Sequence, residues 1–391
     1  MSEPLRPPLA DVNVLEIGTV IMAPFAGKIL RDMGATVIKA EPPGGDIGRR
    51  IGLNNEAGMS ALSLNLNAGK RSIELDAREP DGKSVLRELL AWADVVLTNL
   101  LPASRERLGI DWETVRQINP GAVLCTGQGF SSDSSLGDAP AYDDIVQAAS
   151  GLSDTYRLRD GEPGYSPYVV ADKVCGMMMA NAALAALHDR TVSGAGTWVD
   201  VPMVDTMAGF TMVEHLGGAS YLPQRGPVGW SRVLTPDHRP HRATDGWVCV
   251  MPYTDVNWRA FCELLDRPDL LTHPQLRTTA LRSANAARYE EVIASYAASR
   301  SCERIEEECR ARRIPVQRVN QMDDLVDDPY LAGRPMLTRT THPTEGEYVH
   351  VGSPVTFHGR ERAPVRDLAP LDGDREEVLA LLRRAARTEP A

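Results

Sequence analysis

Asp172 stands immediately before the most apolar stretch of this chain, KVCGMMMANAALAALH, which runs from Lys173 to His188. A helix that is apolar on nearly every side is expected to be buried. Asp172 then has two interpretations. It is an N-cap that accepts hydrogen bonds from first-turn N–H groups, or an ionised nucleophile at a cleft that can form a covalent acyl intermediate. The helix dipole favours the ionised carboxylate in both cases, and the stretch alone favours the cap.

Length and charge narrow the classes of partner. The chain has 391 residues, enough for roughly two or three domains, and 43% of its residues are hydrophobic. The net charge of −11 argues against nucleic acid as the main partner, although a local basic cluster can still hold a small anion.

The cysteines and the apolar segments indicate in which cellular compartment the protein is expected. The six cysteines form no C-x-x-C pair and mostly lie in apolar runs, so we expect buried, reduced thiols and no metal site. The N-terminal residues lack a signal-peptide pattern, and the apolar part of residues 174–187 is too short to span a bilayer. We therefore expect a cytoplasmic protein that binds no membrane.

The elements that must position Asp172 begin with alternating strands and helices over the first 130 residues. This alternation predicts parallel strands with right-handed crossovers, and therefore a doubly wound, Rossmann-like α/β domain. The chain after the first strand reads GTVIMAPFAG, which lacks the G-x-G-x-x-G fingerprint of a dinucleotide site. Strands are predicted at 12–17, 35–40, 71–75, 94–97 and 122–126, with helices at 24–33, 81–92 and 112–117.

Changes in composition predict the domain boundaries. Residues 128–168 are rich in Gly, Ser, Asp and Pro and lead into Asp172, so we expect an irregular segment with a functional role. A large α/β domain is predicted at 1–200, completed by 340–391, with a smaller α+β domain at 225–322. Linkers are predicted at 201–224, which includes a helix at 204–215, and at 323–339.

Seven segments in order along the chain together resemble the family III coenzyme A transferases, the CaiB/BaiF family. This family includes formyl-CoA and carnitine-CoA transferases and 2-methylacyl-CoA racemases. Each segment is weak alone, but their order and spacing are specific to the family. They are residues 14–46, GKRSIELD at 69–76, NLLPASRERLGID at 99–111, PAYDDIVQAASG at 140–151, VVADKVCGMMMANAALAAL at 169–187, RATDGWVCV at 242–250, and 312–334.

The resemblance implies that Asp172 is the catalytic nucleophile of an acyl-CoA:carboxylate CoA transferase. Its carboxylate would attack the thioester, and the reaction would pass through an aspartyl-CoA intermediate without ATP or a metal. The resemblance also implies a homodimer of two interlocked chains. Acyl-CoA and small carboxylic acids are the expected partners.

The resemblance further implies the residues that contact CoA. Arg107 stands in the family's P-x-x-x-x-R-L-G pattern, and Lys70 and Arg71 stand at its Lys-Arg pair. Lys39 ends the second predicted strand, where we expect a phosphate of CoA. The other expected contacts are Asn99 and Leu100 at a strand end, Ile21 and Met22 near the acyl group, and Tyr142.

Three departures from the family pattern affect the predicted substrate. Ile21 replaces a glutamine of the formyl-CoA branch, and Pro140 replaces a basic residue, so a formyl or oxalyl substrate is less favoured. The segment at 225–230, RGPVGW, is not the glycine run that covers the site in that branch.

Two alternatives remain open from the sequence. The racemases of the family use a His and an Asp thirty residues apart, but Tyr142 occupies that position here. Because the ordinary pKa of Tyr is about 10, it is a poor base near neutral pH. A non-catalytic acyl-CoA-binding protein is the second alternative.

Overall fold

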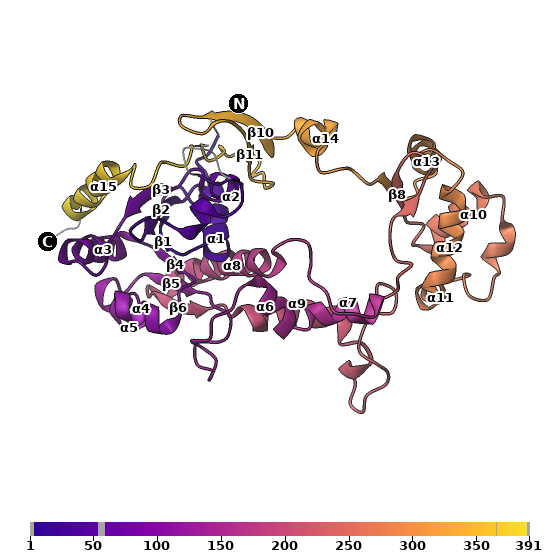
Figure 1. Ribbon diagram of the computed structural model, residues 1–391, viewed down its shortest axis with the longest axis horizontal. Helices are drawn as coiled ribbons and strands as arrows, with labels where there is room; N and C mark the ends of the chain where they lie inside the picture. The colour runs from indigo at the N-terminus through magenta and orange to yellow at the C-terminus, as the bar shows by residue number, and fades with distance from the viewer. Residues whose placement is uncertain (1–3, 54–58, 365, 389–391) are drawn as a thin grey trace. The chain divides into compact units, whose positions relative to one another are not determined.

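The computed structural model describes residues 4–53, 59–364 and 366–388 (Figure 1). The chain divides into two compact units. Unit 1 comprises Met1–Ser150, Ser166–Gly209 and Val326–Ala391, and unit 2 comprises Gly151–Tyr165 and Phe210–Leu325.

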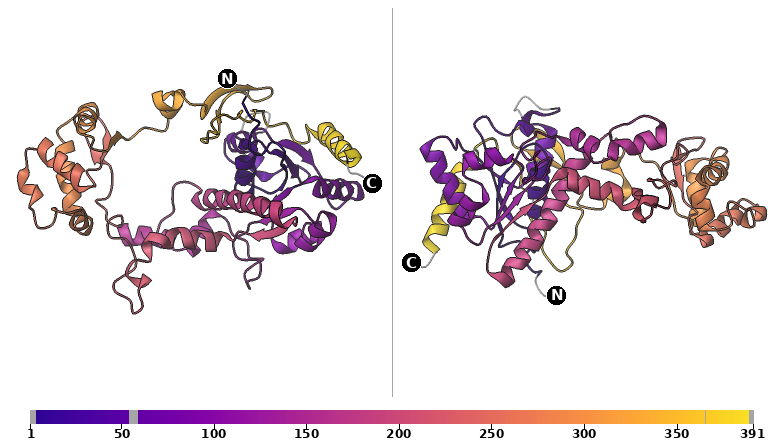
Figure 2. Two further views of the ribbon diagram at one scale, coloured as in Figure 1. Left: turned by 180° about the vertical axis from the view of Figure 1, so that it is seen from behind. Right: turned by 90° about the horizontal axis from the view of Figure 1, so that it is seen from below.

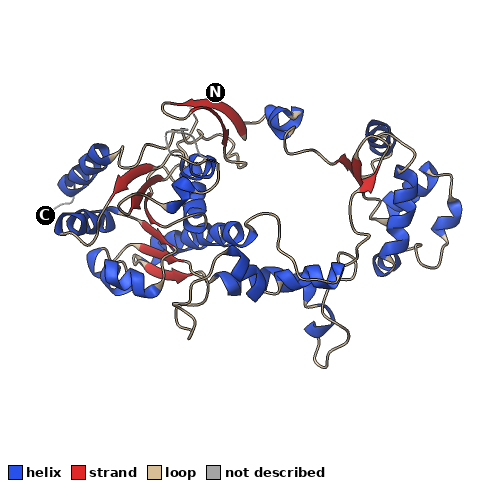
Figure 3. Ribbon diagram, viewed as in Figure 1, coloured by secondary structure: helices blue, strands red, loops and turns tan. Residues whose placement is uncertain are grey.

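Unit 1 is organised around a six-stranded parallel sheet with the order β3-β2-β1-β4-β5-β6 (Figure 3). The strand order reverses direction between β1 and β4, which is the doubly wound arrangement. This finding confirms the α/β class predicted from the alternating pattern. The strands are β1 (Asn13–Ile17), β2 (Thr36–Glu41), β3 (Arg71–Glu74), β4 (Val95–Thr98), β5 (Val123–Thr126) and β6 (Thr197–Asp200).

Helices cover both faces of this sheet because its strands are apolar on both sides. On one face, α3 (Pro80–Trp92), α5 (Trp112–Ile118) and α15 (Arg375–Thr388) join a core with Leu15, Ile38 and Leu124 of the strands. On the other face, α1 (Met22–Asp32) crosses α8 (Val170–Ser193), and both pack on the sheet (Figure 2).

Smaller elements of the chain complete unit 1 and lead into unit 2. They are η1 (Ile47–Arg50), α2 (Ala61–Asn67), α4 (Pro102–Leu108), α6 (Asp143–Ala149), α7 (Leu152–Asp160), α9 (Met203–His215), η2 (Gly217–Ser220), η4 (Leu325–Asp327), α14 (Pro329–Ala332), β10 (Leu337–His342) and β11 (Gly346–Val351). Strands β10 and β11 form an antiparallel hairpin.

Unit 2 has its own core between a small antiparallel sheet and a group of helices. The sheet has the order β7 (His241–Arg242), β8 (Trp247–Val250) and β9 (Val316–Arg318). Its core is rich in aromatic residues, with Phe261 and Tyr296 edge to face at 5.2 Å. The helical elements are α10 (Asp255–Leu264), η3 (Pro268–Leu271), α11 (Thr279–Ala284), α12 (Ala286–Ala297) and α13 (Cys302–Arg310).

Several local expectations were wrong. Residues 128–168 are not one irregular segment, because α6 and α7 form within them, and residues 151–165 group with unit 2. The sequence DDIVQAA of α6 places two acidic residues in the first turn, where the helix dipole stabilises them, but the flanking Gly, Ser and Pro obscured this signal. Cys249 is exposed, whereas the other five cysteines are buried.

Helix α8 is less buried than its composition predicts. One side packs against α1, β5 and β6, but Met177 and Met178 on another side are 44% and 45% exposed. It has 24 residues, which is longer than the apolar part predicted at residues 174–187. It is the one described helix that is long and apolar enough to cross a membrane. Half of that apolar window is buried inside the protein, as is common for core helices, so the length alone does not indicate a membrane span.

Candidate active site

A cavity of about 250 Å³ lies at the carboxyl ends of β1, β4 and β5, and Asp172 lines it. Parallel α/β sheets bind ligands at this edge, where the strand order reverses. Its other lining residues lie in the segments that follow these strands, just before α6, or at the start of α9. They are Thr19, Val20, Met22, Asn99, Leu100, Leu101, Ser104, Gly127, Gln128, Gly129, Pro140, Ala141, Tyr142 and Met203.

Asp172 is not the N-cap of α8. The helix begins at Val170, its cap residue Val169 makes no side-chain hydrogen bond, and Asp172 is the third helical residue. Asp143, from the first turn of α6, instead accepts the backbone N–H of Asp172 at 3.0 Å. Asp143 therefore satisfies an N–H group that the start of a helix otherwise leaves without a partner, and the side chain of Asp172 is left to line the cavity.

The same contact changes the acidity of Asp172. Burial, together with the nearby carboxylate of Asp143, raises the pKa of Asp172 to about 7. Burial and like charge thus oppose the ionised form that the helix dipole favours. Near neutral pH the carboxyl group is divided between its two protonation states.

Gly176 fixes where Asp172 lies, because it is one helical turn further along the same face of α8. A Cβ at Gly176 would lie 2.7 Å from the backbone oxygen of Met22 and 3.2 Å from the Cβ of Phe25. The absence of a side chain lets α8 approach the first turn of α1 closely. Since Met22 also lines the cavity, this crossing brings Asp172 and the start of α1 to one site.

The loop between β1 and α1 is held in a strained conformation. Val20 has φ of 62°, a left-handed conformation that is rare for a β-branched residue and often found at functional sites. Its N–H donates to both carboxylate oxygens of Asp46, at 3.1 and 3.2 Å. Asn99 fastens the same loop, since it accepts the N–H of Thr19 at 2.8 Å and donates to its carbonyl oxygen at 2.9 Å.

Lys39 and Lys70 do not line the cavity, contrary to their expected contact with CoA. Both are fully buried. Lys39 Nζ lies 2.9 Å from Glu16 and 3.0 Å from Asp46, and Lys70 Nζ lies 2.7 Å from the other oxygen of Glu16. An ammonium group enclosed by protein oxygens has no free direction for a phosphate, so in this fold the two lysines hold unit 1 together.

Opposing effects set the charge of this buried cluster. For Lys39, burial lowers the pKa, but Glu16, Asp46 and Glu41 overcome that effect and raise it above its ordinary value. For Lys70, burial outweighs the attraction of Glu16 and lowers the pKa to about 8. Lys39 is thus the firmly charged member, and it supports Asp46 beneath the strained Val20.

The remaining expected CoA contacts fall into two groups. Met22, Asn99, Leu100 and Tyr142 line the cavity together with Asp172, and Tyr142 is 75% exposed. Arg107 is exposed at the rim, where it donates to Ser104 at 3.0 Å. Two expected contacts are not among the residues that line the cavity: Ile21 is buried, and Arg71 pairs with Glu377 at 2.8 Å.

Sequence reasoning missed Asp143, Val20 and Asp46. Asp143 lies within the matched segment PAYDDIVQAASG, but nothing in one sequence separates it from its exposed neighbour Asp144. Valine is not a residue typical of turns, so the sequence does not predict the left-handed conformation of Val20. This conformation follows only from the contacts that hold it. The described residues contain no group of three or more His, Cys, Asp or Glu side chains arranged to bind a metal ion.

Comparison with known proteins identifies the class. Residues 9–375 match CoA-transferase family III. The succinyl-CoA:mesaconate CoA-transferase of Haloarcula hispanica is 30% identical over 95% of each chain. The formyl-CoA:oxalate CoA-transferase of Streptomyces avermitilis is 30% identical over 89% of this chain and 88% of its own.

Solved structures agree with the sequence relatives. A CaiB/BaiF family protein from Brucella suis superposes with a TM-score of 0.80 at 25% identity, over 96% of this chain and all of its own. A variant of Rv3272 from Mycobacterium tuberculosis gives 0.81 at 26% identity, over 96% of this chain and 99% of its own. A doubly wound domain with a cavity at its switch point defines a ligand-binding α/β protein. These matches place the chain more narrowly: it belongs to CoA-transferase family III and is a CoA transferase.

Proposed function

We propose that this enzyme moves CoA from an acyl-CoA to a free carboxylic acid through a covalent intermediate on Asp172. The observation that carries the proposal is the position of this carboxyl group. Asp172 is the one acidic residue among the described lining residues of the cavity, and its pKa of about 7 lies near neutral pH. A desolvated carboxylate is a stronger nucleophile than one that water solvates.

The first half of the proposed reaction releases the donor acid. An oxygen of Asp172 attacks the thioester carbonyl, the C–S bond breaks, and a mixed anhydride and CoA thiolate form. The thiolate then attacks the aspartyl carbonyl of the anhydride, and its C–O bond breaks. Aspartyl-CoA remains on the enzyme and the donor acid leaves as a carboxylate.

The second half repeats these steps in reverse with the acceptor. The acceptor carboxylate attacks aspartyl-CoA, which regenerates an anhydride and CoA thiolate. The thiolate attacks the acyl carbonyl, so the new acyl-CoA forms and Asp172 returns as a carboxylate. Every bond that breaks is replaced by one of similar kind, so the cycle consumes no other reagent.

Asp143 acts as a positioning residue in this scheme. It fixes the backbone of Asp172 through the 3.0 Å hydrogen bond and contributes to the raised pKa. Arg107 is proposed to meet a phosphate of CoA at the rim, with Asn99 and Leu100 beside the pantetheine arm and Tyr142 at the mouth. Ile21 supports the acyl end from behind Met22.

The names of the relatives suggest which substrates to test. Succinyl-CoA occurs in the names of several, with mesaconate, D-citramalate, L-malate or glutarate, and formyl-CoA occurs with oxalate. We propose succinyl-CoA as the first donor and these dicarboxylic acids as the first acceptors.

The racemase alternative loses support at the site. The carboxyl group beside Asp172 is Asp143, and the exposed Tyr142 occupies the position where a His base is required. Two carboxyl groups can still exchange protons, so the alternative requires its own test.

The experiment measures formation of each new acyl-CoA by chromatography after mixing purified enzyme, succinyl-CoA and one acid. We expect transfer to at least one acid and a loss of more than a thousand-fold in Asp172→Ala. The exposed variant Asp144→Ala is the matched control and should retain the parent rate. If Asp172→Ala transferred CoA as fast as the parent enzyme, Asp172 would not be the nucleophile. Deuterium entering the acyl-CoA without any acceptor acid would favour the racemase.

A further inference from the structure

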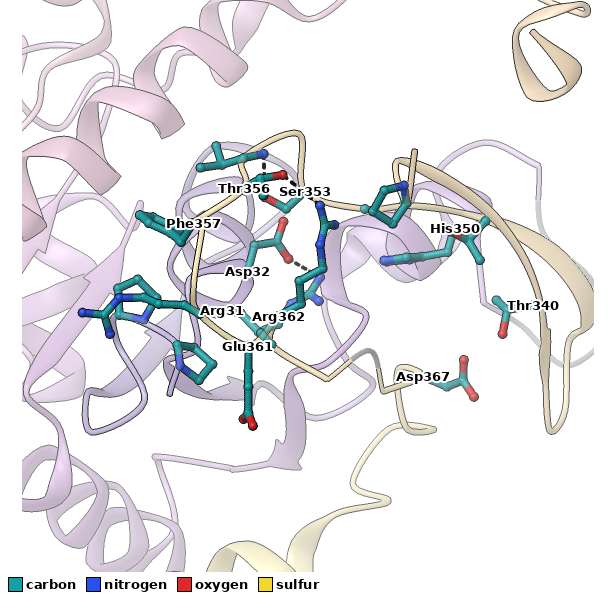
Figure 4. A pocket seen from close by; sticks show the side chains of 18 residues that line it. Arg31, Asp32, Thr340, His350, Ser353, Thr356, Phe357, Glu361, Arg362 and Asp367 are labelled. Carbon is teal, nitrogen blue, oxygen red and sulfur yellow. Dashed lines mark hydrogen bonds and ion pairs between the residues drawn. The ribbon is translucent and has the colours of Figure 1, made fainter. Parts of the chain in front are cut away.

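Unit 1 contains a second cavity, of about 410 Å³, which shares no lining residue with the Asp172 cavity. It lies between the end of α1, the β10–β11 hairpin and the chain that follows the hairpin (Figure 4). Helix α1 connects the two sites: Met22 at its start lines the first, whereas Arg31 and Asp32 at its end line the second. These ends are about 15 Å apart, at 1.5 Å per residue.

The α1 side of this cavity carries an excess of positive charge. Arg31 is 5% exposed, and its Nη2 lies 2.8 Å from one oxygen of Asp32. The other oxygen of Asp32 lies 2.8 Å from Lys28, which is also buried. Two cations therefore share one anion, and Arg31 Nε has no hydrogen-bond partner within the described chain.

His350 on β11 lines the opposite side, with Thr340 and Asp367 beside it (Figure 4). It is 2% exposed, and neither ring nitrogen has a hydrogen-bond partner among the residues that the structure describes. Burial lowers the pKa of His350 to about 4, and Arg31 and Lys28 add to the effect, so the ring is neutral and offers one N–H. Nearly all buried polar groups have a hydrogen-bond partner, because leaving one without a partner costs free energy.

The carboxylates in the wall have partners or lie at the surface. Asp32 forms ion pairs with Lys28 and Arg31. Asp367 accepts a hydrogen bond from the hydroxyl group of Tyr348 at 3.1 Å. Glu361 is exposed. The described groups at the buried end that have no partner include two donors, Arg31 Nε–H and the single N–H of the neutral His350 ring, and a ligand that accepts hydrogen bonds suits both.

We propose that this cavity binds a small organic carboxylate, with the carboxylate between Arg31 and His350. An ionised carboxylate accepts hydrogen bonds through both oxygens and balances the excess charge beside Arg31. The apolar part of the ligand lies against Pro7, Pro8, Val355 and Phe357, which also line the cavity. Inorganic phosphate would leave this apolar wall in contact with water, so the site favours an organic acid. The inference is independent of the nucleophile assigned above.

A local reporter separates this site from the Asp172 cavity. Phe357 is 39% exposed at the wall, so Phe357→Trp places an indole there with little disturbance. The full-length variant is titrated with butyrate, glutarate and inorganic phosphate in the absence of CoA, and the parent enzyme is the fluorescence blank. We expect a saturable change with at least one of the two organic acids, and binding of phosphate at least ten-fold weaker.

Second substitutions in the reporter background test the named contacts. His350→Phe removes the free N–H and should weaken acid binding at least ten-fold. Because a buried change can disturb folding, Thr340→Leu provides an independent test by filling the half-buried wall near His350. Asp172→Ala should bind the acid as the reporter does. The proposal is overturned if neither acid changes the indole signal, if phosphate binds as tightly, or if folded His350→Phe and Thr340→Leu variants both bind like the reporter.

Discussion

At the residue scale, Asp172 and Asp143 form the pair on which the chemistry depends. A nucleophilic carboxylate must be ionised, yet burial and the second carboxylate both favour its protonated form. The raised pKa makes the ionised form more reactive but less populated. The pair thus sets the pH range in which the enzyme works.

The pH dependence of the free enzyme follows from the pKa of Asp172. Since only the carboxylate attacks, kcat/KM should be constant at alkaline pH and fall as pH decreases through about 7. Asp143→Asn removes the like charge but retains an oxygen that can accept the Asp172 N–H. We expect its profile to shift to lower pH by a fraction of a unit to one unit.

Asp144→Asn is the matched control for that profile, because Asp144 is the exposed neighbour on α6. Its midpoint should stay at the parent value. A profile for Asp143→Asn that coincides with the parent's, or moves to higher pH, would contradict the role given to Asp143.

At the element scale, the crossing of α1 and α8 positions the nucleophile. Gly176→Ala would place a methyl group 2.7 Å from a backbone oxygen, so one helix must move. We expect kcat to fall at least ten-fold and the protein to lose about 1–3 kcal/mol of stability, a typical cost of overpacking. Steady-state kinetics and denaturant unfolding measure the two effects.

Gly209→Ala on α9 is the control, since a Cβ there meets no atom within 4 Å. It should keep parent activity. Equal kinetics and stability for Gly176→Ala and the parent would show that the helices do not need this close approach.

Substitutions in and outside the buried charge cluster of β1 and β2 distinguish cations that stabilise the fold from cations that bind CoA. Lys39→Met leaves Glu16 and Asp46 buried without their shared partner, and breaking such a cluster costs about 3–5 kcal/mol. We expect this loss of stability in urea unfolding without any CoA present. Arg107→Met, at the exposed rim, should unfold like the parent but raise KM for acyl-CoA.

The opposite result would support the predicted contact between Lys39 and CoA. If Lys39→Met unfolded at the parent's urea midpoint and only its KM increased, the ammonium group would have to reach CoA.

At the scale of the whole molecule, two exposed methionines of α8 provide a test of the expected homodimer. Met177 and Met178 of α8 are 44% and 45% exposed. We predict that light scattering after size exclusion gives a dimer for the parent and monomer for Met177→Glu. Glu303→Lys on the exposed side of α13 should remain dimeric, and a dimeric Met177→Glu would argue against this face.

The large domain was predictable because its signals are local and repeated. Strand and helix periods alternate over the first 130 residues, and Asp172 stands out beside an apolar helix. The partners that tune the site were not predictable, because Asp143 and Asp172 are far apart in sequence and meet only through folding. Lys39 shows a different case: a cation at a strand end suggests a phosphate contact, and only the folded chain reveals its carboxylate partners.

The covalent intermediate on Asp172 can be detected by digesting the enzyme after incubation with acyl-CoA and measuring the mass of the peptide that contains Asp172. We expect this peptide to gain the mass of CoA less one water, and hydroxylamine to convert the adduct to a hydroxamate on Asp172. An unmodified Asp172 peptide during active transfer, or an adduct on another residue, would contradict it.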